Sequence, residues 1–314
     1  MSGWRPSSLN DIPLLSLTND FHTVPLHPTL RASFPLLFVL IWSSGFIIAR
    51  YGMPHAEPMT FLLMRFVLVL MLLLPMAWLA QAPWPPRPLA WKIALAGLLL
   101  QAGYLGGVWA AVREGMTAGL VALIMGLQPI LTAVFLSLLK ERIRPVQWLG
   151  LALGLAGVSL VVWAKLSLVG LSELSLWLAA LALASITIGT LYQKRACPDF
   201  DLRTGAAIQF MASALACLPF VWLLETREVT WHPELIFALA WSVLAISVGA
   251  IFLLFILIRE GAATQVTSLL YLTPPTTAAM AWLLFDEPFT LTTLAGTLAT
   301  MAGVWLVSRS ARPA

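Results

Sequence analysis

The stretch Arg113–Glu141 reads REGMTAGLVALIMGLQPILTAVFLSLLKE, a long apolar run with charges at both ends and one proline inside it. The stretch Arg259–Glu287 reads REGAATQVTSLLYLTPPTTAAMAWLLFDE. The second stretch begins 146 residues after the first, and the opening Arg-Glu-Gly, the proline and the closing glutamate coincide. The chain therefore contains an internal repeat, which organises the rest of its sequence.

Further matches extend this repeat over both halves of the chain. At an offset of 146 residues the matches are Pro129 with Pro275, Glu141 with Glu287, Gly150 with Gly296 and Gly157 with Gly303; earlier in each half, at an offset of 144 residues, they are Gly45 with Gly189, Arg65 with Gln209 and Pro75 with Pro219. A composition rich in glycine is the alternative explanation. The spread of the matches over five helices per copy favours a true repeat.

Composition places this repeat in a membrane. Hydrophobic residues make up 60% of the chain and charged residues 10%, whereas soluble domains have about 25% charged residues. Apolar segments of about 20 residues can span the bilayer as helices. Ten such segments lie near residues 33–50, 59–80, 89–112, 117–139, 146–164, 174–192, 204–224, 235–258, 264–285 and 290–308. The sequence predicts an all-α integral membrane protein with ten transmembrane helices.

The basic residues predict the orientation of these helices. Of the 18 Lys and Arg residues, thirteen lie in segments that are inside when the N-terminus is cytoplasmic, four lie outside, and Arg65 lies within a span. By the positive-inside rule both termini are cytoplasmic, with residues 1–32 as an N-terminal tail. Five helices per copy is an odd number, so the second copy is inverted relative to the first. The predicted location is the inner (plasma) membrane.

Several motifs together resemble a known family. They are the mid-helix Pro129 and terminal Glu141 of the stretch from Gly119, the Gly150, Gly154 and Gly157 series, the second copy of this pattern, Trp42-Ser43-Ser44-Gly45 in the first helix and Arg65-Phe66 in the second. In order, spacing and duplication they resemble the EamA repeat of the drug/metabolite transporter superfamily, over residues 33–308.

The resemblance implies a first repeat over 33–165 and a second over 173–309, each of five helices and inverted relative to one another. Helices one to four and six to nine would surround a central cavity, and helices five and ten would pack at the periphery. It also implies a secondary transporter that exports small organic metabolites such as amino acids, by alternating access at the cavity between the repeats.

Arg65 is the candidate for binding an anionic substrate, because it is the ionisable residue well inside a span. Burying it costs about 2.5–3.5 kcal/mol on insertion scales, and a guanidinium binds a carboxylate with two parallel hydrogen bonds. A structural alternative remains: the side chain could anchor backbone carbonyls or extend toward the membrane surface. Its repeat partner, Gln209, carries no charge, so one half alone supplies a fixed charge at this depth.

Prolines interrupt the fourth helix of each copy, at Pro129 and at Pro274 and Pro275. A proline inside a helix leaves a carbonyl without its backbone partner, and such carbonyls are tolerated at membrane depth against protein or a wet cavity. We expect gating kinks at these prolines and substrate contacts from the adjacent Gln128 and Thr273. The alternative is a plain kink with no role in binding.

Other side chains of the expected cavity helices complete the candidate substrate site. They are Trp42, Ser43, Tyr104, Trp109, Tyr192, Gln209 and Tyr271. Interfacial belts of Trp and Tyr are the alternative for the aromatic residues. Gly103 and Gly107 form a GxxxG pattern, which predicts a close helix contact rather than a site.

The remaining residues argue against other functions. No carboxylate lies in the middle of a predicted span, no catalytic set is visible, and the chain carries no P-loop, so an enzyme is not predicted. The histidines, His22, His27, His55 and His232, show no metal-ligand spacing, and neither a metal, a cofactor nor nucleic acid is expected. The expected partners are a small-molecule substrate and the lipid bilayer. The alternatives are a non-transporting structural or regulatory membrane subunit and an intramembrane enzyme.

Overall fold

The structure is a computed structural model that describes residues 28–138, 145–169, 171–197, 199–250, 253, 272–287 and 290–310. Apart from one isolated bridge between Ala56 and Val229, the regular elements of these ranges are helices. They are α1 (Pro28–Gly52), α2 (Pro58–Leu79), α3 (Arg87–Gly97), η4 (Leu98–Gly103), α4 (Tyr104–Arg113), α5 (Ala118–Met125), α6 (Gln128–Leu138), α7 (Pro145–Val169), α8 (Glu173–Ala196), α9 (Leu202–Leu223), α10 (Pro233–Trp241), η5 (Ser242–Ala250), α13 (Thr273–Phe285) and α14 (Leu291–Ser310).

Six helical segments of the described ranges are long and apolar enough to cross a membrane, among them the continuous helix Arg87–Arg113, which joins α3, η4 and α4. Shorter apolar helices cover Ala118–Thr132, Trp148–Val161 and Leu291–Leu306. Large apolar side chains cover the outside of the bundle: Trp78 is 78% exposed and Leu223 81%. Exposure on this scale would be unfavourable in water and suits contact with lipid.

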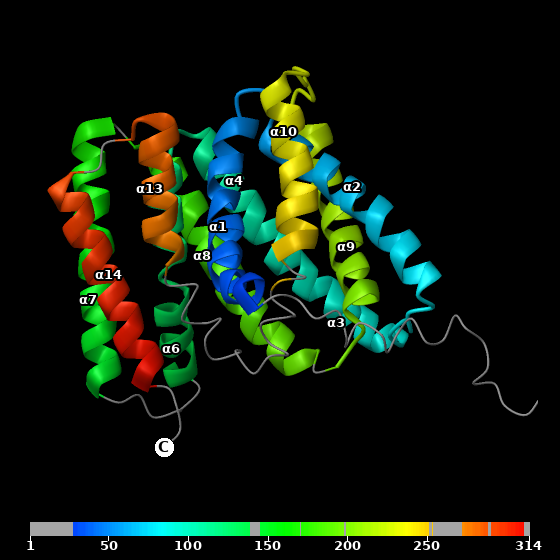
Figure 1. Cartoon of the computed structure of the whole chain (residues 1–314), viewed down its shortest axis with the longest axis horizontal. Coiled ribbons are helices and arrows are strands. Elements are labelled where there is room, and N and C mark those ends of the chain that lie inside the picture. Colours follow the sequence, from blue (N-terminus) through cyan, green and yellow to red (C-terminus); the bar gives the residue numbers. More distant parts are fainter. Residues whose placement is uncertain are drawn as a thin grey trace, which may run out of the picture.

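The helices α7 and α14 lie side by side at one edge of the bundle (Figure 1). These are the fifth helices of the two copies, which the family resemblance places at the periphery. Glycines allow their backbones to approach: a Cβ atom on Gly303 would lie 2.5 Å from the carbonyl oxygen of Gly150. Small residues give membrane helices this close contact, because apolar side chains gain nothing by leaving lipid.

A second close contact joins α4 to α8 at the predicted GxxxG pattern. A Cβ atom on Gly103 would lie 2.7 Å from the Ser185 hydroxyl oxygen, and one on Gly107 would lie 2.8 Å from the Leu178 carbonyl oxygen. The prediction that these glycines serve a helix contact is confirmed.

The third helix of each copy contains a π-helical segment, η4 in the first and η5 in the second. The two segments begin at Leu98 and Ser242, which are 144 residues apart, the same offset as between Gly45 and Gly189. Wide turns of this kind are rare and often lie at functional sites. Both copies therefore carry the same irregularity at the same place.

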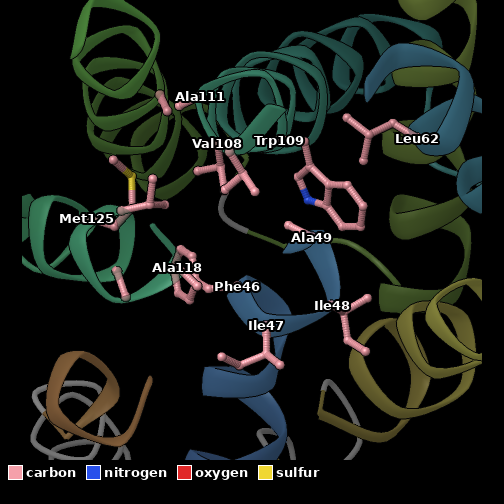
Figure 2. Packing of buried hydrophobic residues seen from close by; sticks show 14 of the residues in the cluster. Phe46, Ile47, Ile48, Ala49, Leu62, Val108, Trp109, Ala111, Ala118 and Met125 are labelled. Carbon is pink, nitrogen blue, oxygen red and sulfur yellow. The ribbon is translucent and has the colours of Figure 1, made fainter. Parts of the chain in front are cut away.

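The buried hydrophobic cluster of the described residues extends over most of the helices, and Figure 2 shows the part where α1, α2, α4 and α5 meet. Trp109 of α4 is 1% exposed and stacks on Phe61 of α2, with 4.3 Å between ring centroids. Figure 2 shows its indole pointing between Leu62 and Ala49. Trp109 thus fills the core between helices, instead of forming the cavity wall that the family scheme implies.

Candidate functional site

A cavity of about 100 Å³ lies between helices of both copies. In the described ranges α1, α4, α5, α6, α8, α13 and α14 contribute side chains, and the residue between α5 and α6 adds a backbone surface. The lining residues are Trp42, Phe46, Tyr104, Ala122, Met125, Gly126, Gln128, Pro129, Ile186, Thr273, Pro274, Thr300, Met301 and Val304. Apolar walls with a few polar groups are typical of small-molecule sites.

The break between α5 and α6 of the first copy and the start of α13 in the second meet at this cavity. In the first copy α5 ends at Met125 and α6 begins at Gln128. In the second, α13 begins at Thr273, directly before the two prolines. A Cβ atom on Gly126 would lie 3.0 Å from Cγ of Pro274, so the backbone between α5 and α6 is in contact with the proline ring at the start of α13. Only a residue without a side chain fits here without displacing this ring.

Two hydroxyl groups near the breaks are buried without a hydrogen-bond partner in the part of the chain that the structure describes. They are Oγ of Ser43 in α1 and Oγ1 of Thr273 in α13. A buried hydroxyl without a partner costs about 1–3 kcal/mol, and in native proteins such groups are usually satisfied by water or ligand. The backbone of Ser43 is bonded, since its carbonyl oxygen accepts from Thr277 Oγ1 at 3.2 Å. Of the two residues with unpartnered hydroxyls, Thr273 lines the cavity and Ser43 does not.

Gln128 is fixed by the second copy. Its Nε2 donates to Oγ1 of Thr190 in α8 at 3.0 Å, and Thr190 in turn donates to the Ile186 carbonyl oxygen at 2.6 Å. This bond uses the amide nitrogen of Gln128, so the amide oxygen of this cavity residue can accept a hydrogen bond from a ligand. A cavity side chain held in one rotamer in this way loses little entropy on binding a ligand.

Arg65 lies beside the cavity rather than on its wall. It is 5% exposed, and its Nε and Nη2 donate to Oγ of Ser247 in η5 at 3.3 and 3.1 Å. Ser247 Oγ donates to the Ser242 carbonyl oxygen at 2.9 Å. No carboxylate of the described residues forms an ion pair with this guanidinium. Tyr104, which lines the cavity, is close enough to Arg65 to interact with its charge.

The other predicted residues lie away from the cavity wall. Gln209, 8% exposed, donates from Nε2 to Oε1 of Gln193 at 2.8 Å, and Tyr192 is half-buried on α8. Pro275 adjoins the lining residue Pro274. Tyr271 lies outside the described residues.

Sequence reasoning missed Ser247, the hydrogen-bond partner of Arg65. A signal was present in the repeat: at the offset of 144 residues Ser247 corresponds to Gly103, just as Arg65 corresponds to Gln209. Both members of the Arg65–Ser247 pair therefore differ between the copies. Phe46, Ile186 and Met301, which line the cavity, are ordinary apolar residues that no sequence pattern distinguishes from the core.

A larger apolar hollow of about 560 Å³ lies between α2 and α9. Its lining includes Val67 and Met71 of α2 and Met211 and Leu215 of α9, and all four side chains are exposed on the outside of the bundle. No polar side chain converges there. We therefore place the candidate site at the cavity between the copies.

The helices α2 and α9 begin at opposite ends of the bundle, and each touches the loop that follows the other. At the glutamate end, defined by Glu57 and Glu225, the Glu225 carboxylate accepts from the backbone nitrogens of Met59 and Thr60 and from Thr60 Oγ1, each at 2.7 Å. Glu57 Oε2 accepts in return from the backbone nitrogen of Thr226 at 2.6 Å and from Thr226 Oγ1 at 2.9 Å. Charged acceptors make strong bonds at helix starts.

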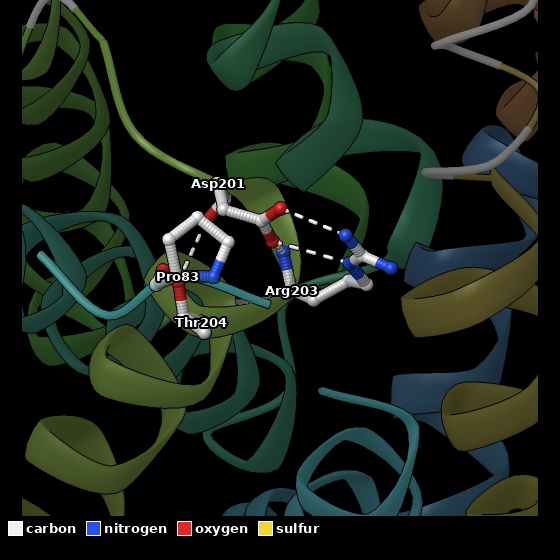
Figure 3. A network of polar contacts seen from close by, with 4 residues as sticks. All are labelled: Pro83, Asp201, Arg203 and Thr204. Carbon is white, nitrogen blue, oxygen red and sulfur yellow. Dashed lines mark hydrogen bonds and ion pairs between the residues drawn. The ribbon is translucent and has the colours of Figure 1, made fainter. Parts of the chain in front are cut away.

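The equivalent contact at the other end is weaker. At this aspartate end, defined by Asp201, Thr204 Oγ1 donates to the Pro83 carbonyl oxygen at 2.9 Å (Figure 3). Asp201 itself binds its own helix: Arg203 donates to it from the backbone nitrogen at 2.9 Å and from Nη2 at 2.9 Å. The side-chain bond from Arg203 holds the pKa of the Asp201 carboxyl below its ordinary value. Among the described residues, carboxylates thus link the two copies at the glutamate end.

Glu287 adds a third link at the glutamate end. Its Oε1 accepts from the backbone nitrogen of Ala118, at the start of α5, at 3.2 Å, and the residue is 8% exposed. The closing glutamate of the second copy therefore caps a helix of the first. Its match, Glu141, lies outside the described residues.

Comparison with known families fits this two-copy arrangement. The model of the EamA-like transporter family matches residues 32–163 and again residues 173–309. The chain belongs to this family. Membership of this family, together with the names of its relatives, identifies the chain as a membrane transporter. None of the names given below describes an enzyme.

Curated relatives cover most of the chain. It is 31% identical over 249 residues to the uncharacterized inner membrane transporter YedA of Escherichia coli K12, covering 77% of this chain and 79% of YedA. It is 27% identical to the uncharacterized transporter YvbV of Bacillus subtilis, covering 91% and 94% of the two chains. A probable amino-acid metabolite efflux pump of Salmonella typhimurium is 25% identical, with coverage of 86% and 92%.

The fold of this EamA protein also matches a solved structure. A protein crystal structure superposes with a TM-score of 0.61 at 18% identity, covering 89% of this chain and 96% of that one. At this identity the likeness concerns the fold alone.

Proposed function

We propose that the chain is a secondary transporter that exports small organic metabolites, with amino acids as the first class to test. The observation that carries this proposal is the contact of Gly126, between α5 and α6, with Pro274, at the start of α13, beside a cavity lined by both copies. Discontinuous helices at the interface of repeats are where secondary transporters bind substrate. The name of the Salmonella relative, an amino-acid metabolite efflux pump, supports the substrate class.

The size of the cavity supports alternating access as the mechanism. Its volume is about 100 Å³, whereas ligand sites commonly have about 300–1,000 Å³. A substrate therefore needs the two copies to move apart. The carboxylate links favour a form closed at the glutamate end, and release of Glu57 and Glu225 from their partners opens that end. Loading at the opposite end and release at the glutamate end give export.

Arg65 is proposed to bind the substrate carboxylate when the copies move. Its guanidinium donates to the Ser247 hydroxyl, which is a neutral partner. A substrate carboxylate in place of this hydroxyl would form stronger, charge-assisted hydrogen bonds with Arg65. The neighbouring Tyr104 connects this position to the cavity. Trp42, Ser43, Gln128 and Thr273 are proposed to hold the rest of the substrate.

Ten membrane spans, with the first copy over 33–165 and the second over 173–309, belong to the same proposal. The positive-inside rule puts both termini in the cytoplasm and the glutamate end outside. Cys197 cannot report this orientation well, because it is 4% exposed and burial raises the pKa of its thiol. Single cysteines at the exposed Glu228 and Lys194, in a chain with both native cysteines replaced by alanine, serve instead. An impermeant maleimide should label Glu228→Cys in intact cells, and Lys194→Cys only after permeabilisation.

Transport itself is tested in proteoliposomes loaded with radiolabelled amino acids, one at a time. Arg65→Gln should raise the half-saturation concentration at least tenfold, equivalent to about 1.4 kcal/mol of binding free energy. Arg65→Lys should restore part of the affinity, because the lysine ammonium keeps the charge but lacks the planar guanidinium that forms two parallel hydrogen bonds with a carboxylate. Arg87→Gln, at an exposed arginine of α3, is the matched control and should transport normally.

Two outcomes would count against the proposal. Unchanged half-saturation in Arg65→Gln would remove Arg65 from the site. Absence of flux for every amino acid and for a wider panel of small metabolites, in folded protein, would favour a membrane subunit without transport.

A further inference from the structure

Three side chains that can bind a metal meet at the surface of the glutamate end. His55 follows α1, His232 precedes α10, and Glu234 lies in the first turn of α10. Nε2 of His55 is 2.9 Å from Oε2 of Glu234, and Nδ1 of His232 is 3.9 Å from the same oxygen. One donor atom from each residue can be chosen so that all three lie within 4.8 Å of one another.

The backbone holds His55 and the loop before α10 together. Ala56 and Val229 form a β-bridge, and the backbone nitrogen of Thr230 donates to the His55 carbonyl oxygen at 2.9 Å. The imidazole rings of His55 and His232 stack with 4.6 Å between centroids and 12° between planes. The donor atoms are therefore brought together by the fold before any ligand arrives, which lowers the entropic cost of binding.

Access from solvent is open on one side. The His55 side chain is 15% exposed, whereas those of His232 and Glu234 are 49% and 48% exposed. An ion can reach the cluster through the exposed pair and find the buried His55 behind it. A fourth ligand position is then available to water.

We propose that His55, His232 and Glu234 bind a divalent transition-metal cation of the zinc class. Two imidazole nitrogens and one carboxylate oxygen form a donor set that such cations favour. With metal–nitrogen bonds of about 2.0–2.1 Å, neighbouring ligand atoms of a tetrahedral site are about 3.3 Å apart. The separations of 2.9 and 3.9 Å from the carboxylate oxygen lie on either side of this value, whereas the three donor atoms together lie within 4.8 Å of one another. The stacked imidazole rings must therefore rotate toward the ion to complete the site.

Binding requires a lone pair on each nitrogen. Nε2 of His55 faces a carboxylate and carries hydrogen in the metal-free protein, so this hydrogen moves to Nδ1 through solvent and frees the Nε2 lone pair. Nδ1 of His232 accepts from the backbone nitrogen of Glu234 at 3.3 Å, and the cation takes over that lone pair.

The cation would join the two copies of the repeat. His55 belongs to the first matched segment, residues 32–163, and the other two ligands belong to the second, residues 173–309. Ion binding therefore stabilises the closed glutamate end by mass action. The metal site itself does not depend on the proposed transport function, because its ligands lie outside the cavity.

The test is titration of Zn²⁺ into the metal-free full chain, purified through a tag without histidine and followed by calorimetry. We expect one equivalent to bind, with Mg²⁺ giving no heat. His232→Ala should weaken Zn²⁺ binding about tenfold or more. Mutation of residues that only hydrogen-bond to metal ligands already costs about tenfold in metal affinity, and His232 is proposed as a ligand itself. His27→Ala, a histidine from the tail, is the matched control and should bind as the native chain does.

A second measurement keeps the test valid if a variant folds poorly. Zn²⁺ should raise the melting temperature of the native chain and of a chain with Cys197→Ser and Cys217→Ser, but not that of His232→Ala. His232→Ala also removes the cap at the start of α10, which lowers the metal-free melting temperature, so the change caused by Zn²⁺ is measured for each variant against its own metal-free value. Equal Zn²⁺ affinity in His232→Ala and the native chain, or a melting temperature that Zn²⁺ does not move, would overturn the site.

Discussion

Gly157 of α7 faces the backbone of Gly296 in α14, so closely that a Cβ atom on Gly157 would lie 2.5 Å from the Gly296 carbonyl oxygen. Gly303 faces the carbonyl oxygen of Gly150 in the same way. Gly150 matches Gly296, and Gly157 matches Gly303, at the offset of 146 residues. Exchange of the two copies therefore maps one contact onto the other, as a two-fold axis requires.

This contact predicts a large effect of a single methyl group. Gly157→Ala should destabilise the protein by about 1–3 kcal/mol, because the new atom meets backbone that cannot rotate away. Thermal unfolding in detergent measures the change. Gly45→Ala is the control, since its Cβ would meet one side-chain carbon at 3.7 Å. An equally large loss of stability in Gly45→Ala of α1 would show that the effect of an added methyl group does not depend on the close backbone contact.

Glu225 should contribute strongly to stability through the start of α2. Glu225→Gln removes the charge from an acceptor of three hydrogen bonds, and we expect a loss of about 1.5–3 kcal/mol, the value of bonds to a charged group. The same change at the nearby exposed Glu228 should have little effect. The melting temperatures of the two variants test this prediction. Equal values would mean that a neutral amide at this position replaces the Glu225 carboxylate without loss of stability.

Asp201 should make stability depend on acidity. Since its folded pKa is lowered by Arg203, its contribution is full above the unfolded pKa of about 3.9 and is lost as the pH falls through the folded value. The difference in melting temperature between the native chain and Asp201→Asn should be constant above about pH 5 and shrink below it. Asp199→Asn, at an exposed carboxylate, should show no such trend; a difference independent of pH would contradict the role of the charge.

Pro129 should affect the rate of transport more than affinity. Pro129 lies in the first turn of α6, where its missing N–H costs no helical bond. Pro129→Ala adds a donor that can join α5 to α6 by one backbone hydrogen bond of about 1 kcal/mol, which corresponds to about fivefold slower turnover if the bond must break in each cycle. Pro75→Ala, at a proline of α2 on the lipid-facing hollow, is the control. Initial rates over a range of substrate concentration separate turnover from half-saturation, and unchanged turnover in Pro129→Ala would argue for a rigid kink.

The repeat and its glycines could be predicted because they depend on residue spacing alone. Gly103 and Gly107 are four residues apart on one helix face, and their contact with α8 follows from that spacing. Pro129 likewise predicts where the fourth helix of the first copy is interrupted, between α5 and α6. Such features can be predicted without knowing how each helix is rotated about its axis.

The sequence could not predict which way several side chains point. Trp109 follows η4, and a π turn changes the angle between successive residues, so a regular helical period drawn through Arg87–Arg113 misplaces the indole. His55 and Glu234 are 179 residues apart in the chain, and only the approach of two loops brings them together. Metal ligands contributed by distant loops leave no spacing pattern to detect.

The paired π-helical segments bear on the history of the chain. An insertion shared at Leu98 and Ser242 is most simply inherited from a single ancestral unit that carried it before gene duplication. The later offset rises from 144 to 146 residues between Ser242 and Arg259, in the interval that contains the longer of the two segments. The two added residues of the second copy therefore lie at or after the start of η5 and before Arg259, while the spacing on either side of this interval is shared by both copies.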